Sequence, residues 1–303
     1  MYTNISTNIK KSIMHIVKHH ISIQEIRELL IEFIEYQSKK DFLFGELLVL
    51  HYDLHKGAKT DEIYTIAACV ELIILSFDIL DDFEDEDADH SPWMNTPNVS
   101  LNITTNLLYL SLDLIRKSNF EHKEKGVSIL LEYALQSING QYKDLLGSCK
   151  TEKDYIEMTL EKSGSLVTLA CLLGTVLATG IPSESVKKYS AYIGLIGQIN
   201  NDIQDVQVDL NGKNDLVHYK YTLPIIYLLN NQDIHIIRDY YHHKITREEL
   251  VENQDFIFQK IEETGAILYA EVLKKIYQNK AAKEIQSTYS QNSDSIKLLN
   301  YIY

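Results

Sequence analysis

Apolar residues recur along this chain mostly at intervals of three and four positions, the spacing that gathers them on one face of an α-helix. Residues 21–36 show the pattern clearly, with apolar side chains at positions 23, 26, 29, 30, 33 and 34. Comparable patterns predict helices at 42–55, 101–118, 125–146, 154–179, 248–263 and 266–278. Strand-like alternation is scarce, so the chain is predicted to be all-α. Residues 1–20 are polar, and we expect a loosely ordered segment there.

A long apolar run, residues 67–80, leads directly into an acidic block, residues 81–89, in which seven of nine residues are Asp or Glu. If the helix continues, Asp81 and Asp85 lie one turn apart on one face, with Asp82 beside them. Such crowded carboxylates repel one another unless a cation lies between them. Oxygen ligands of this kind suit a hard ion such as Mg²⁺. Taken by itself, however, an acidic block is more typical of a solvated loop.

A sparser copy of the same arrangement follows later in the chain. The apolar segment that begins at residue 189 leads to Asn201, Asp202 and Asp205, which repeat the spacing of the first motif 202 − 82 = 120 residues later. Two oxygen clusters at the ends of two apolar helices can face each other across the core of a bundle. We therefore expect the two motifs together to hold Mg²⁺ ions and a diphosphate between them.

The composition narrows the class of protein. The formal net charge is −14, which argues against nucleic-acid binding, since phosphate backbones require a basic surface. Cys69, Cys149 and Cys171 are far apart and include no Cys-x-x-Cys pair, which indicates reduced thiols in a cytoplasmic protein. The most apolar stretch, 166–181, is too short for stable membrane insertion. With four prolines and twelve glycines the chain contains no evident linker, and we expect a single domain over residues 1–303.

Five sequence elements occur in a characteristic order: Asp81-Asp82-x-x-Asp85, Lys162-Ser163, Gln198, Asn201-Asp202-x-x-Asp205, and Lys220 followed by Thr222-Leu223-Pro224. In this order they resemble the all-α trans-isoprenyl diphosphate synthases, and the resemblance covers residues 40–230. It implies a helical bundle of the isoprenoid synthase type with a central active-site cavity.

The resemblance also implies roles for individual residues. The principal metal ligands and catalytic residues would be Asp81, Asp85, Asn201 and Asp205, with Asp82 and Asp202 as further Mg²⁺ ligands. The diphosphate would contact Lys162, Gln198 and Lys220. Phe77 lies one turn before Asp81, where a bulky side chain would shorten the prenyl-chain pocket. It therefore favours a geranyl over a farnesyl donor, unless it only packs in the core.

Two departures from the family pattern concern the second substrate. Chain-elongating members carry a Lys-Arg pair that follows an early glycine, but Gly45 is followed by Glu46 here. They also carry an Arg pair after the first motif, where this chain reads EDADHSPW. Without these cations the chain keeps the allylic half of the site and loses the half that binds isopentenyl diphosphate. That combination resembles the isoprenyl transferases of Bacillus competence quorum sensing, which implies prenyl transfer to a tryptophan of a pheromone precursor peptide.

Three alternatives remain open at this point. An elongating isoprenyl diphosphate synthase is disfavoured by the missing basic pairs. A terpene cyclase stays possible because Asn201, Asp205 and Asp209 are four residues apart and could share one helix face. A non-catalytic partner subunit would be expected to lose the metal ligands that this chain keeps. Related synthases are often homodimers, and this analogy leaves the oligomeric state open.

Overall fold

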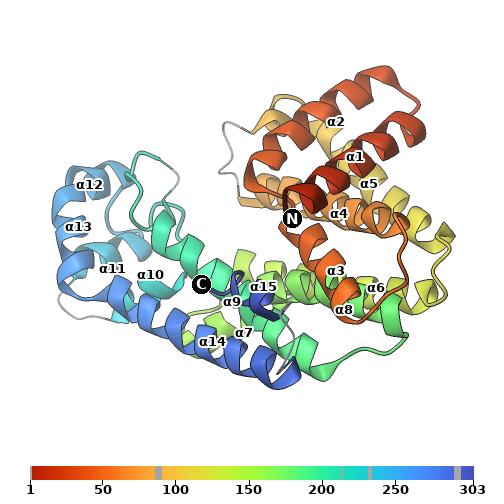
Figure 1. Ribbon diagram of the computed structural model, residues 1–303. Helices are drawn as coiled ribbons and strands as arrows, with labels where there is room; N and C mark the ends of the chain where they lie inside the picture. The colour runs from red at the N-terminus through yellow and green to blue at the C-terminus, as the bar shows by residue number, and fades with distance from the viewer. Residues whose placement is uncertain (1, 86–90, 213, 231–233, 290–294) are drawn as a thin grey trace. The chain divides into compact units, whose positions relative to one another are not determined.

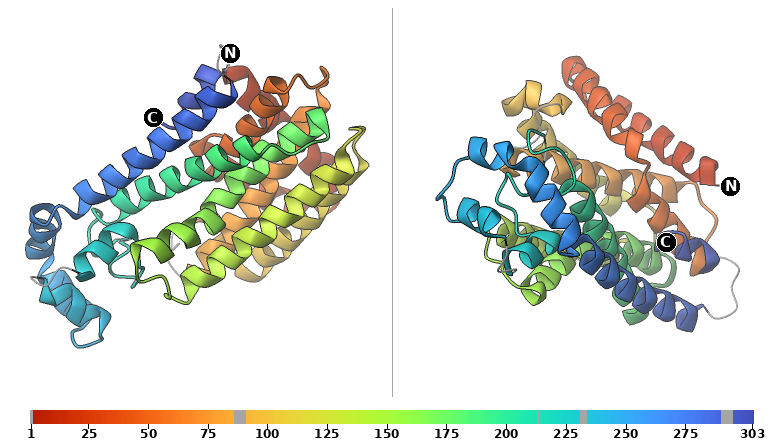
Figure 2. Two further views of the ribbon diagram at one scale, coloured as in Figure 1. Left: turned by 90° about the horizontal axis from the view of Figure 1, so that it is seen from below. Right: turned by 90° about the vertical axis from the view of Figure 1, so that its left-hand side faces the viewer.

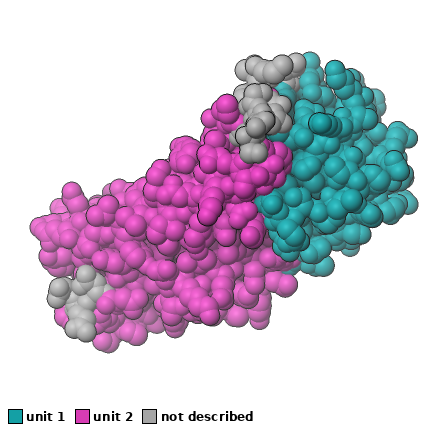
Figure 3. Space-filling view, turned by 60° about the horizontal axis from the view of Figure 1, so that its bottom comes forward, with its two compact units in different colours: residues 1–135, 166–187 teal, residues 136–165, 188–303 magenta. Residues whose placement is uncertain are grey.

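The computed structural model describes residues 2–85, 91–212, 214–230, 234–289 and 295–303. These residues form helices and turns and include no strand, which confirms the all-α prediction. They divide into two compact units, unit 1 with residues 1–135 and 166–187 and unit 2 with residues 136–165 and 188–303 (Figure 3). The prediction of a single domain over residues 1–303 stays a prediction.

Unit 1 is built around one helix that is buried on every side. Its elements are α1 (Tyr2–His20), α2 (Gln24–Gln37), η1 (Ser38–Lys40), α3 (Leu43–Leu54), α4 (Glu62–Asp85), η2 (Pro92–Asn95), α5 (Pro97–Lys117), the first part of α6 (Lys123–Leu145) and nearly all of α8 (Ser165–Thr179) (Figure 1). Helices α1, α3 and α5 all pack against α4. The buried positions of α4 follow one another without a break from Ile66 to Ser76, so no face of this part of the helix meets solvent.

The expectation of a loosely ordered segment at residues 1–20 is wrong, because residues 2–20 form the helix α1. Its buried side chains are Ile9, Ile13, Ile16 and Val17, each at most 2% exposed. Their spacing of four, three and one places them on one helix face, and that face packs on α4. The polar residues between them cover the opposite face, which explains why composition alone suggested disorder.

Unit 2 contains the second part of α6, α7 (Glu152–Thr159), η3 (Leu160–Gly164), most of α9 (Glu184–Asp205), α10 (Leu223–Asn230), α11 (His235–Tyr241), α12 (Arg247–Glu252), α13 (Gln254–Glu263), α14 (Ala266–Thr288) and α15 (Ser295–Leu299). Helices α9 and α14 run antiparallel beside each other (Figure 2), with Lys188 paired to Glu284 and Lys274 bonded to Asn200. The predicted helix at 248–263 is two helices, which meet at Asn253.

The segment η3 is a single π-helical turn inside the continuous helix from Glu152 to Thr179. A π-turn contains one residue more than an α-turn, and such bulges often occur at functional sites. This long helix and α4 are apolar and long enough to cross a membrane, but 72% of the most apolar window of each is buried inside the protein. Burial of this extent is typical of core helices.

Candidate active site

The first acidic motif lies in the last turns of α4, in unit 1. Asp81, Asp82 and Asp85 are all partly buried there. Ser91 Oγ and Trp93 Nε1 both donate to Asp82 Oδ2, at 3.0 Å and 2.8 Å. Residues 86–89 of the acidic block and His90 lie outside the described residues. Asp82 thus fastens the segment that follows the motif to the end of α4.

Trp93 is a core residue, with 2% of its surface exposed. Its ring contacts Phe33 and Tyr36 edge to face, with centroids 5.7 Å and 5.3 Å apart. Because the indole N–H is bonded to Asp82, the position of this carboxylate is coupled to the packing of α2. Phe77 is partly buried on α4, one turn before Asp81, and its role in setting donor length stays a prediction.

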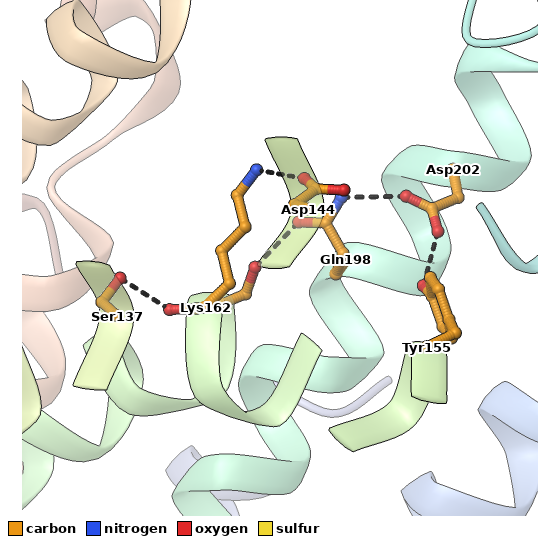
Figure 4. A network of polar contacts seen from close by, with 7 residues as sticks. Ser137, Asp144, Tyr155, Lys162, Gln198 and Asp202 are labelled. Carbon is orange, nitrogen blue, oxygen red and sulfur yellow. Dashed lines mark hydrogen bonds and ion pairs between the residues drawn. The ribbon is translucent and has the colours of Figure 1, made fainter. Parts of the chain in front are cut away.

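The second acidic motif lies at the end of α9, in unit 2, and its members differ in exposure. Asn201 is exposed, Asp205 is partly buried and Asp202 is 1% exposed. Asp202 accepts hydrogen bonds from Tyr155 at 2.5 Å and from Gln198 at 2.9 Å (Figure 4). Gln198 in turn accepts a hydrogen bond from Ser163 Oγ at 2.9 Å. The network therefore joins α7, η3 and α9.

Helix α9 ends at Asp205 and does not continue to Asp209. Asp209 lies in the following turn, where it accepts hydrogen bonds from the backbone and side chain of Asn211. Gln254 donates to its other oxygen. Asn201, Asp205 and Asp209 consequently do not form a row along one helix, and the spacing that suggested a terpene cyclase has lost its structural basis.

Lys162 lies in the π-segment η3 and forms an ion pair with Asp144 of α6 at 2.8 Å (Figure 4). The side chains of Lys162 and Asp144 are 18% and 27% exposed, so both are mostly shielded from water. Ser137 donates to the carbonyl oxygen of Lys162 at 2.9 Å. The Lys162 ammonium, predicted to contact the diphosphate, is therefore held in place by an ion pair.

Two glycines, Gly140 and Gly194, bring the backbones of α6, η3 and α9 unusually close. A Cβ atom at Gly140 would lie 2.3 Å from the Lys162 nitrogen, and one at Gly194 would lie 2.6 Å from both Gly164 Cα and the Ser163 oxygen. No side chain fits at either position, because the nearest atoms belong to the backbone. The close packing holds Lys162 and Ser163 against the helix that carries Gln198 and Asp202.

Burial dominates the electrostatics of this part of unit 2. It raises the pKa of Asp202 to about 6, against the opposing effect of the hydrogen bonds from Tyr155 and Gln198. Burial and the nearby charge of Asp202 raise the pKa of Asp215 to about 8, although Lys220 favours its ionised form. The backbones of Lys220 and Asp215 are directly bonded, because the Lys220 N–H donates to the Asp215 carbonyl oxygen at 3.0 Å.

Of the residues that the sequence singled out, Gln198 and Asp202 share a hydrogen bond, and Lys162 precedes Ser163, which donates to Gln198. The roles predicted for them stay predictions. The sequence analysis missed Asp144, Tyr155 and Asp215. Tyr155 lies 47 residues from its partner Asp202, and no periodic pattern connects the two.

The donors that both motifs offer are carboxylate and amide oxygens, the ligands that hard divalent cations prefer. No group of three or more His, Cys, Asp or Glu side chains close enough to hold a metal ion occurs within the described part of the chain. The first motif belongs to unit 1 and the second to unit 2. Their convergence on a central cavity stays a prediction.

Comparisons with known proteins define the class. Residues 43–256 match the polyprenyl synthetase family, and the chain belongs to this family. Its fold is the all-α fold of isoprenyl diphosphate synthases, and the enzyme class is that of the prenyltransferases. A polyprenyl synthase from Caulobacter crescentus, crystallised with calcium and isoprenyl diphosphate, superposes with a TM-score of 0.83 at 19% identity, covering 99% of this chain and 93% of that one.

Among individual relatives, the chain is 37% identical over 274 residues to the tryptophan prenyltransferase ComQ of Bacillus subtilis subsp. natto. The match covers 89% of this chain and 84% of that protein. ComQ of Bacillus subtilis strain 168 is 33% identical over 276 residues, with 89% and 90% covered. These findings confirm the resemblance drawn from the motifs.

Proposed function

We propose that the protein transfers a prenyl group from an allylic diphosphate to the side chain of a tryptophan in a pheromone precursor peptide, with Mg²⁺ as cofactor. The relatives named as tryptophan prenyltransferases support the acceptor. The observation that carries the proposal is the contrast between two parts of the molecule. Unit 2 contains Lys162, Gln198 and Lys220, which we assign to the diphosphate, whereas the beginning of α3 has no basic pair.

At the beginning of α3, the Gly45 N–H donates to the carboxyl of Glu71 at 2.5 Å. Glu71 is 7% exposed, and burial raises its pKa to about 8. A helix N-terminus offers N–H groups to an anion, but here an acidic side chain occupies that position and Glu46 follows in the first turn. A second diphosphate would meet acidic groups at this place and no Lys-Arg pair.

In the proposed reaction, Lys162, Lys220 and Gln198 bind the allylic diphosphate. The C–O bond breaks, its electron pair goes to the diphosphate oxygen, and a carbon of the indole ring attacks the allylic cation. The ring system then releases one proton. Mg²⁺, held by Asp81, Asp82 and Asp85 and by Asn201, Asp202 and Asp205, would supply the positive charge that stabilises the leaving diphosphate. The reaction requires that water be excluded from the site, because water would otherwise capture the cation.

The donor is proposed to be geranyl diphosphate rather than farnesyl diphosphate, because Phe77 would close the pocket one turn below Asp81. Phe77→Ala should raise the ratio of farnesyl to geranyl use by about tenfold, in line with the contribution of a few methylene groups. Competition between the two donors, read by product mass, measures the ratio. An unchanged ratio would mean that Phe77 only packs in the core.

The decisive experiment combines purified protein, Mg²⁺ and either geranyl or farnesyl diphosphate with a tryptophan-containing precursor peptide, its Trp→Ala version or isopentenyl diphosphate. A prenyl mass gain on the tryptophan peptide alone, abolished by a chelator, is the expected result. A longer diphosphate product without peptide modification would instead identify an elongating synthase.

Two further parts of the proposal concern the setting of the enzyme. A cytoplasmic location is supported by Cys69, Cys149 and Cys171, which are all buried free thiols. A homodimer is supported by an exposed apolar row on the unit 2 part of α6, where Ile138 and Tyr142 are 50% and 62% exposed. Light scattering of wild-type protein and Ile138→Lys tests this; a wild-type monomer would reject the dimer.

A further inference from the structure

The backbone immediately before Lys220 has a conformation that its sequence does not favour. Tyr219 has a φ of 57°, in the left-handed region that glycine adopts readily and that L side chains rarely adopt. Non-glycine residues persist there only where the surroundings enforce the conformation, and such positions cluster at functional sites. The contacts of Tyr219 must therefore stabilise its left-handed backbone conformation.

Three rings surround the Tyr219 side chain. Tyr240 stacks on it with a centroid distance of 4.5 Å and an interplanar angle of 8°. Tyr241 meets it edge to face at 5.6 Å, and His243 lies tilted at 5.0 Å. Tyr240 and Tyr241 are the last two residues of α11, so the end of this helix holds the turn before Lys220.

The hydroxyl groups of the same two tyrosines bond to the backbone of that turn. Tyr241 donates to the Lys220 carbonyl at 2.6 Å, and Tyr240 donates to the Val217 carbonyl at 2.9 Å. Burial and the nearby Asp215 carboxyl raise the pKa of Tyr241 well above its usual value, so its phenol stays a hydrogen-bond donor. Since the Lys220 N–H is bonded to Asp215, both backbone polar groups of Lys220 are fixed.

We propose that Tyr219, Tyr240 and Tyr241, here called the tyrosine clamp, are positioning residues that hold Lys220 in the orientation needed to bind diphosphate. The clamp holds Tyr219 in a backbone conformation that its sequence does not favour. The orientation of the Lys220 ammonium therefore depends on the packing of α11 against this turn. The inference rests on the proposed function, which assigns Lys220 to the diphosphate.

The test compares two hydrogen-bond deletions of equal chemistry in the full-length protein. Tyr241→Phe and the control Tyr52→Phe each remove one part-buried hydroxyl that donates to a backbone carbonyl, at 2.6 Å and 2.8 Å, and both keep the ring. Tyr52 lies in unit 1, outside the clamp. We expect both to lower the Tm by a similar amount. Tyr241→Phe should weaken binding of inorganic pyrophosphate with Mg²⁺ by about tenfold and raise KM for the allylic diphosphate, with a smaller change in kcat. Tyr52→Phe should stay within about twofold of wild type.

A second pair of variants separates strain from folding. Tyr219→Gly relieves the left-handed backbone but frees the turn, so it should fold with a similar Tm and bind pyrophosphate more weakly. Lys56→Gly is the matched control, because Lys56 also has a left-handed φ, 59°, but lies exposed in unit 1. It should leave the affinity for pyrophosphate unchanged.

Lys220→Ala distinguishes the proposed role of Lys220 from the proposed role of the clamp. If it leaves pyrophosphate affinity unchanged, the proposed role of Lys220 is wrong. If it weakens binding while Tyr241→Phe and Tyr219→Gly bind like wild type, the clamp proposal is overturned and the assignment of Lys220 survives. Equal weakening by Tyr52→Phe and Tyr241→Phe would also overturn the clamp, because it would reflect a general loss of stability.

Discussion

Asp82 and Asp202 occupy the same position of two similar motifs, yet they differ in solvent exposure and in their hydrogen-bond partners. Asp82 is partly exposed and receives its hydrogen bonds from residues that directly follow in the chain, Ser91 and Trp93. Asp202 is buried and receives them from Tyr155 and Gln198, of which Tyr155 is distant in sequence. The same local sequence can therefore fasten a loop in one unit and connect three helical segments in the other.

The difference extends to electrostatics. Burial raises the pKa of Asp202 to about 6, and the neighbouring Asp215 has a pKa raised to about 8. A protein site that gathers buried carboxyls in this way gains from a cation, because the cation relieves both burial and mutual repulsion. Unit 2 supplies one such cation itself, Lys162, already paired with Asp144.

The largest expected effect comes from removing a proposed metal ligand from either motif. Asp81→Ala and Asp205→Ala should each reduce kcat by about 10²–10³-fold, the loss seen when one stabilising group of a charged transition state is removed. Glu84→Ala is the control, since Glu84 belongs to the same acidic block but is exposed. Prenyl transfer at saturating donor measures the effect. Full activity in either Asp variant would remove that residue from the site.

Next in size is the effect of filling the contact between η3 and α9. Gly194→Ala would place its Cβ against backbone atoms of Ser163 and Gly164, so the free energy of unfolding should fall by about 1–3 kcal/mol. Gly197→Ala lies on the same helix with no atom within 4 Å of the added carbon, and it should stabilise the helix by up to about 1 kcal/mol. Urea denaturation compares the pair, and equal stabilities would contradict the packing argument.

A pH-dependent effect distinguishes Glu71 of unit 1 from exposed carboxylates. Its pKa is about 8 in the folded protein against 4.5 as the ordinary value, so folding favours the protonated form. The contribution of Glu71 to stability is complete below pH 4.5 and is lost as the pH rises through 8. Glu71→Gln should therefore flatten the fall in Tm across this window, whereas Glu25→Gln, at an exposed position, should leave the slope as it is. Parallel slopes for wild type and Glu71→Gln would refute the assignment.

The smallest effects compare the two Asp residues directly. Tyr155→Phe and Ser91→Ala each delete one hydroxyl donor to the middle carboxylate of a motif. We expect a loss of about 1–3 kcal/mol in the free energy of unfolding for Tyr155→Phe, whose carboxyl partner is buried. Ser91→Ala should lose about 1 kcal/mol, because Asp82 keeps Trp93 as a donor and partial access to water. A larger loss for Ser91→Ala would reverse the contrast drawn between the motifs.

Helical periodicity was sufficient to predict most elements of the fold, and the family resemblance singled out Gln198 and Asp202, which share a hydrogen bond. The error at α1 was avoidable, since Ile9, Ile13, Ile16 and Val17 carry the helical spacing, but the polar composition outweighed it. Other features had no local signal. The end of α9 at Asp205 and the hydrogen bond from Tyr155 to Asp202 depend on contacts between distant segments.

The π-turn at Leu160–Gly164 has a consequence for the evolution of the sequence. Because one residue of an α-helix corresponds to a rotation of about 100°, a chain shorter by one residue here would turn α7 by that angle relative to the residues after it. Tyr155 would then face away from Asp202 although no residue of the motifs had changed. Insertions and deletions in this segment should therefore be tolerated less than most substitutions. A homologue with an alignment gap there should lack the hydrogen bond from Tyr155 to Asp202.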